Sequence, residues 1–261
     1  FVRQEIYFPL VGMAILGNVL IIINYFVGLK NPLTLLIVIL LLLPNFIGLS
    51  SFNLPTINLR ALFYYGVIPA ILIISLYDTN WHYDAGYYHL NQQNLLRESN
   101  MIIGTVNIFW AFGMSSIYEY MSAFLWIDKS FILIHFMTLI FIQSFYIYLI
   151  SNLENTRYKE MVYASYLLLA YSLLDNVGIN GGRNGFLYVQ GVTKQDMPVA
   201  VLMVMIGLSC LLVLKHRKIE KIDIFVLFLI SLFLIQIKLS SVVIGYLLVN
   251  LCIFIYRNNI K

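Results

Sequence analysis

Residues 33–49 have the sequence LTLLIVILLLLPNFIGL, a run without a single charged side chain. A helix needs about 20 mostly apolar residues to cross the hydrocarbon core of a bilayer. The chain is therefore expected to be an all-α integral membrane protein, with about eight or nine transmembrane helices. The other apolar runs lie at residues 6–27, 61–77, 131–150, 161–174, 199–214, 224–237 and 241–256.

The composition supports lipid as the solvent for much of the chain. Of 261 residues, 61% are hydrophobic and 11% are charged, with a mean hydropathy of +0.86, whereas soluble domains carry about 25% charged residues. The apolar runs lack the two-residue alternation of barrel strands, which argues against a membrane β-barrel. The net charge of +4 comes from short basic clusters between the runs, a pattern typical of cytoplasmic loops, so no nucleic-acid partner is expected.

Basic residues predict the orientation. The cluster at residues 215–221 is placed in the cytoplasm by the positive-inside rule. Counting runs from this cluster and from Arg3 puts two larger loops outside, at residues 78–127 and 175–197. The two counts agree only if residues 100–127 cross the membrane twice or not at all, so we expect a surface-lying or re-entrant helix there. No composition shift marks a second domain, and residues 1–261 are treated as one transmembrane domain.

The first outer loop carries ionisable groups that could do chemistry. If the segment that starts at Asp84 is helical, Asp84, Tyr87 and Tyr88 share one face and His89 lies near its edge. A partly desolvated carboxylate at a membrane interface can act as a general base toward a hydroxyl. The simpler alternative is that Asp84, or Asp78 before it, only caps a helix.

Two other uses of this loop stay open. His82, Asp84 and His89 could bind a divalent cation, although their spacing matches no strong metal motif. The interleaved aromatic residues, Tyr87 and Tyr88 among them, could form an interfacial belt or stack on sugar rings. We therefore assign no metal ligands and leave a divalent cation as a possible cofactor.

Further candidates lie later in the chain. Arg183, in a glycine-rich turn of the second outer loop, suits a phosphate, although a solvated turn is the simpler interpretation. Lys194 and Asp196 lie just before a proline that suits the first turn of a helix, so Asp196 could act as a cap. Glu119 and Lys238 lie in or beside apolar runs, where ionisable groups are costly and usually paired or functional.

Several short motifs follow one another in a characteristic order. They are DAGYYHL at 84–90, IGTVN at 103–107, FGMSS at 112–116, QDMPVA at 195–200 and IKLS at 237–240. In this series the chain resembles a group of bacterial multispanning envelope proteins that are often encoded with surface-polysaccharide genes. That group in turn resembles the GT-C glycosyltransferases.

The resemblance implies a GT-C-like fold, with a helical first large extracytoplasmic loop, and an activity. Such an enzyme takes a sugar from a polyprenyl-phosphate donor and transfers it to a glycan or lipid acceptor. By this resemblance, Asp84 would be the general base or acceptor-orienting carboxylate, His89 would support it, and Asp196 would be a second acidic group. Lys238 or Arg183 would contact the carrier phosphate. The expected substrate-binding residues are Asp78, His82, Tyr87, Tyr88, Asn107, Arg183, Lys194 and Lys238.

The expected protein is thus a multi-pass protein of the bacterial cytoplasmic membrane, with its active loops outside and the bilayer, donor and acceptor as its partners. The main alternative is a non-enzymatic transporter or flippase for lipid-linked glycans. A structural subunit of an envelope complex is a third possibility, in which substitution of Asp84 should matter little.

Overall fold

A computed structural model describes residues 4–47, 59–76, 83–113, 116–154, 158–176, 195–216 and 220–257 of the chain. Helices are the only regular elements within these ranges, so the expected all-helical class is confirmed. Within the described residues, each of the eight apolar runs lies mostly on helix. The main helices are α1 (Phe8–Asn24), α2 (Pro32–Ile47), α3 (Leu59–Leu62), α4 (Ile68–Leu76), α5 (Leu90–Glu98), α6 (Ile117–Leu125), α7 (Ile132–Glu154), α8 (Lys159–Asn176), α9 (Asp196–His216), α10 (Lys221–Ile237) and α11 (Val243–Arg257).

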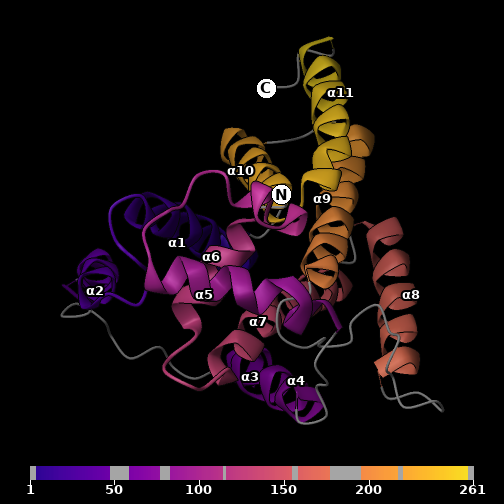
Figure 1. Cartoon of the computed structure of the whole chain (residues 1–261). Helices are drawn as coiled ribbons and strands as arrows, with labels where there is room; N and C mark the ends of the chain where they lie inside the picture. The colour runs from indigo at the N-terminus through magenta and orange to yellow at the C-terminus, as the bar shows by residue number, and fades with distance from the viewer. Residues whose placement is uncertain are drawn as a thin grey trace.

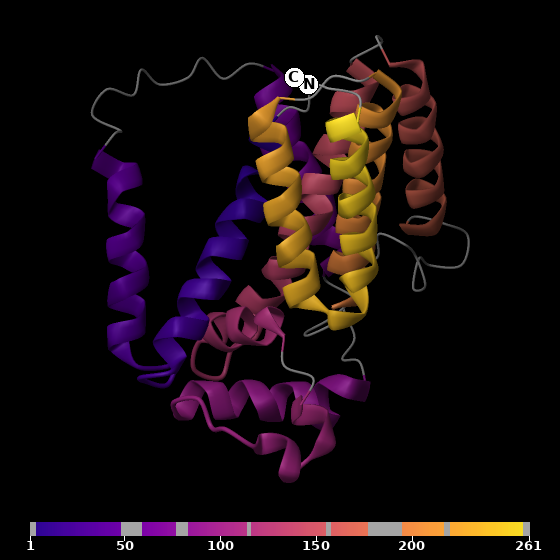
Figure 2. The same ribbon diagram turned by 90° about the horizontal axis from the view of Figure 1, so that it is seen from above.

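Helix α7 lies at the centre of a bundle. It packs against α1, α4, α6, α8 and α9, and α10 packs against α1, α9 and α11. The rings of Phe141 on α7 and Phe233 on α10 stack with their centroids 6.0 Å apart, and neither is exposed by more than 1%. Figure 2 shows α1, α9, α10 and α11 running side by side along this bundle.

Within the described ranges, three helices are long and apolar enough to cross a membrane by length and composition: Ile132–Glu154, Asp196–Lys215 and Leu239–Arg257. Shorter apolar helices cover Phe8–Asn24, Pro32–Leu43 and Leu59–Ile73.

Helix α2 stands apart from the bundle (Figures 1 and 2) and exposes leucine and isoleucine side chains around most of its surface. Such surface is unusual in water but is ordinary for a helix surrounded by lipid.

The segment at residues 100–127 does not form a single spanning helix. Its described residues form two 3-10 turns, η5 (Thr105–Asn107) and η6 (Trp110–Gly113), followed by the nine-residue α6. Nine helical residues extend about 14 Å, roughly half of the hydrocarbon core. Helix α5 and the turns after it lie across one end of the bundle (Figure 2), and α6 packs between α5 and α1.

Helix α5, η5 and η6 form a layer across one end of the bundle. The loop between α1 and α2 attaches this layer to the bundle. The backbone N–H groups of Leu29 and Lys30 donate to the carbonyl oxygens of Leu96 and Arg97, at 3.0 and 3.1 Å. The buried Asn24 side chain also donates to the Leu96 carbonyl oxygen at 2.9 Å. The end of α5 is therefore fixed to the end of α1.

Candidate functional site

A cavity of about 460 Å³ lies where the layer meets the end of the bundle. Its polar lining comes from three separated segments of the chain: the turn before α5, the start of α9, and the end of α10. The volume falls in the range of small-molecule sites in proteins. The polar and ionisable side chains that line it include Asp84, Tyr88, His89, Gln195, Asp196 and Lys238.

A π-helical turn, η4 (Ala85–His89), sets the geometry of the first segment. In an α-helix, residues five apart lie about 140° apart around the axis. In a π-helix the backbone bonds run from i to i+5, and here the Leu90 N–H donates to the Ala85 carbonyl. The wider turn brings His89 onto the same side as Asp84, and both line the cavity.

The expected face of this segment was therefore wrong. Tyr87, which we expected beside Asp84 and Tyr88, does not line the cavity. Its ring stacks on Tyr83 at a centroid distance of 5.5 Å and contacts Phe109 edge-on at 5.3 Å. The expected face assumed an α-helix of 3.6 residues per turn, which a π-turn does not follow. Asp84 precedes the turn, but its side chain makes no capping hydrogen bond there.

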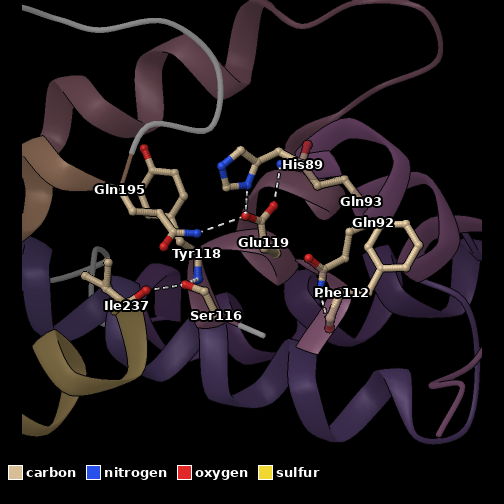
Figure 3. A network of polar contacts seen from close by, with 9 residues as sticks. All are labelled: His89, Gln92, Gln93, Phe112, Ser116, Tyr118, Glu119, Gln195 and Ile237. Atoms are coloured by element: carbon tan, nitrogen blue, oxygen red, sulfur yellow. Dashed lines mark hydrogen bonds and ion pairs between the residues drawn. The ribbon is translucent and has the colours of Figure 1, made fainter. Parts of the chain in front are cut away.

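Behind His89 lies a buried carboxylate, Glu119, which is only 1% exposed. The His89 Nδ1 atom lies 2.5 Å from Glu119 Oε1, to which Gln195 Nε2 also donates at 2.9 Å. Gln93 Nε2 donates to the other carboxylate oxygen at 2.7 Å. These partners come from η4, α5 and the residue before α9, so Glu119 joins three segments at one point (Figure 3).

The start of α6 places Glu119. Ser116 caps this helix: its Oγ accepts from the Tyr118 N–H at 3.1 Å and donates to the Ile237 carbonyl oxygen at 2.5 Å. The second bond links α6 to the last residue of α10, next to Lys238. Glu119 lies in the first turn of α6, where the helix dipole favours a negative charge.

Lys238 and Asp196 form an ion pair across the cavity lining. Lys238 follows the last residue of α10, and Asp196 is the first residue of α9. Both side chains are about half exposed, at 41% and 53%, so a ligand in the cavity can reach either of them. Asp196 was expected as a cap or a second acidic group, and here its carboxylate is paired with a lysine.

Tyr88 is surrounded by acidic groups. Partial burial raises the pKa of its phenol above the usual value, and the negative charges of Asp84, Glu119 and Asp196 raise it further. A phenol with a raised pKa keeps its proton at neutral pH, so Tyr88 can donate a hydrogen bond into the cavity.

Five of the predicted site residues thus lie around one cavity, although they are up to 154 positions apart in the sequence (84 to 238). These are Asp84, Tyr88, His89, Asp196 and Lys238. Asn107 is an exposed residue of η5 outside the cavity lining. Four other predicted residues lie outside the described part of the chain: Asp78, His82, Arg183 and Lys194.

The sequence-based prediction left out Glu119 as a site residue, together with Gln93 and Gln195. Glu119 gave one signal, a carboxylate within an apolar stretch, which indicates a paired or functional group. The glutamines gave none, because an uncharged side chain in a polar segment is unremarkable until its partner is known. Within the described residues no group of three or more His, Cys, Asp or Glu side chains could hold a metal ion.

Comparison of the chain with family models, curated proteins and solved structures gave no match.

Proposed function

We propose that this chain is a membrane glycosyltransferase of the GT-C type. It would transfer a sugar from a polyprenyl-phosphate donor to a cell-surface glycan or lipid acceptor, on the outer face of the bacterial cytoplasmic membrane. The observation that carries the proposal is the cavity at the end of the bundle, which gathers Asp84, His89, Asp196 and Lys238.

The position of the cavity suits a lipid-borne donor. A polyprenyl chain stays in the bilayer while its phosphate and sugar lie at the interface, level with the end of the bundle. The ammonium group of Lys238 would contact the phosphate, exchanging part of its pairing with Asp196 for the new anion. Asp84 would orient the acceptor hydroxyl or accept its proton, and the Tyr88 phenol would donate to a sugar oxygen.

Ion pairs support the proposed topology of eight spans with residues 78–127 outside. Lys30 pairs with Glu98 and Lys238 with Asp196, and all four are assigned to the outer side. Arg60 pairs with Glu154 and Lys215 with Glu160, and these four are assigned to the cytoplasmic side. No ion pair between described side chains joins residues assigned to opposite sides.

A transporter for lipid-linked glycans is favoured less by the geometry. Transporters of known type hold substrate near the bilayer midplane, between broken helices. Here the cluster of ionisable side chains lies at the end of α10 and the start of α9, not halfway along them.

The test is the surface-glycan composition of four strains: wild type, a deletion, and the deletion complemented with Asp84→Asn or with Glu98→Gln at equal expression. Glu98 is a matched control, because it lies in the same layer but pairs with Lys30 outside the cavity. We expect Asp84→Asn to lose the same sugar as the deletion, and Glu98→Gln to restore it.

Restoration by Asp84→Asn, when the deletion lacks the sugar, would overturn the catalytic assignment. The protein would then act as a transporter or a scaffold.

A further inference from the structure

The buried carboxylate of Glu119 has no direct access to the cavity, because His89 and Gln195 line the cavity in front of it. An ionisable group with 1% exposure costs free energy unless its hydrogen bonds are satisfied. Glu119 meets this condition with three hydrogen-bond partners, one of which is the imidazole that lines the cavity. Any effect of Glu119 on a ligand must therefore act through His89 or Gln195, and of these two only the imidazole can take up a proton.

The hydrogen bonds determine how His89 is protonated. Carboxylate oxygens only accept hydrogen bonds, and the two glutamines approach Glu119 with their amide nitrogens. An ionised Glu119 requires a donor from its third partner as well, so a neutral His89 ring bound to it carries its proton on Nδ1. The other ring nitrogen, Nε2, is left as the acceptor and points away from Glu119 (Figure 3).

From this geometry we infer that Glu119 is a positioning residue that makes His89 the proton acceptor of the site. The inference rests on the proposed glycosyl transfer and deepens it. A base held by a third group through its other nitrogen is the arrangement found in many nucleophilic and general-base sites. As a class, imidazoles are stronger bases than carboxylates.

The acceptor hydroxyl oxygen attacks the anomeric carbon of the sugar, and the bond from that carbon to the phosphate oxygen breaks. Its electron pair leaves with polyprenyl phosphate, which gains one negative charge, and the hydroxyl proton moves to Nε2 of His89. Glu119 then stabilises the imidazolium, Lys238 meets the new phosphate charge, and Asp84 keeps the role of orienting the acceptor.

The first test is ¹⁵N NMR of the whole chain in nanodiscs, with labelled histidine. The His89 signals are those that disappear in His89→Gln. We expect neutral His89 to be protonated on Nδ1 in the wild type, and Glu119→Gln to shift the ring toward the Nε2-protonated form. An Nε2-protonated ring in the wild type would overturn the inference, and this outcome does not depend on enzymatic activity.

The second test is complementation of the deletion strain with Glu119→Gln and Glu119→Asp. General-base catalysis contributes about 10²–10⁴-fold, so we expect Glu119→Gln to slow glycan formation by about 10²-fold or more. Glu119→Asp keeps the carboxylate and should recover part of the rate.

The Glu119 inference and the glycosyltransferase proposal can be contradicted by different results. If Asp84→Asn loses the sugar while folded Glu119→Gln makes it at the wild-type rate, the Glu119 inference is wrong and the glycosyltransferase proposal stands. If both variants make it at the wild-type rate, the proposed function is wrong.

Discussion

At the scale of single residues, Gly28 is where the loop after α1 comes closest to α5. A β-carbon at this position would lie 2.4 Å from the Arg97 carbonyl oxygen and 3.1 Å from the backbone of Glu98 and Ser99. Backbone atoms cannot rotate away as a side chain can. The missing side chain of Gly28 therefore allows the contact that fixes the layer to the bundle.

We predict that Gly28→Ala lowers the free energy of unfolding by about 1–3 kcal/mol, because the added carbon forces the two backbones apart. Gly12→Ala is the matched control: Gly12 lies on the exposed side of α1 with no atom within 4 Å of an added carbon. It should be neutral or slightly stabilising, since alanine favours helix. Unfolding in detergent micelles measures both, and equal stabilities for the two variants would contradict the packing described.

Some residues of the site could be predicted from sequence, and others could not. Asp84, His89 and Lys238 stood out because charged or titratable groups are few in such an apolar chain. Glu119 was noticeable for the same reason, but nothing in the sequence indicates that His89, Gln93 and Gln195 converge on it. Convergence depends on how separate helices pack, which a single sequence does not contain.

At the scale of elements, the apolar runs predicted the positions of the helices well, because each is long and contiguous. The π-turn at Ala85–His89 could not be predicted, since it differs from an α-turn by one extra residue and leaves no change in composition. That one residue determines that His89, rather than Tyr87, faces the cavity. The break of the 100–127 segment into short pieces was suggested only by the count of crossings.

A prediction at this scale concerns the start of α6. Ser116→Ala removes both the helix cap and the bond to the Ile237 carbonyl oxygen. We expect the loss of about 1–2 kcal/mol of stability, and reduced activity because Lys238 follows Ile237.

Ser231→Ala is the control for this variant. Ser231 is as buried as Ser116, but its hydroxyl bonds only to Leu227 of its own helix, a contact that contributes little. Equal loss from both serine variants would show that the link between α6 and α10 adds nothing beyond an ordinary buried hydroxyl.

At the scale of the whole molecule, the bundle carries one exposed ion pair at the cavity and another at the opposite end. Helix α9 extends about 30 Å between them: Asp196 at its start pairs with Lys238 at the cavity, and Lys215 near its end pairs with Glu160 of α8. Both ion pairs are roughly half exposed, and such pairs contribute little to stability, with a median of about 0–1 kcal/mol. The two pairs are therefore alike in exposure and differ in the surface on which they lie.

Because the two pairs are similarly exposed, replacing each of them tests whether the cavity at the end of the bundle is the catalytic site. The measurement is the surface-glycan composition of the deletion strain complemented with Asp196→Asn/Lys238→Met or with Glu160→Gln/Lys215→Met, at equal expression. We predict that the cavity variant fails to restore the missing sugar, while the variant at the other end of α9 restores it. Full restoration by the cavity variant would show that the cavity is not the catalytic site.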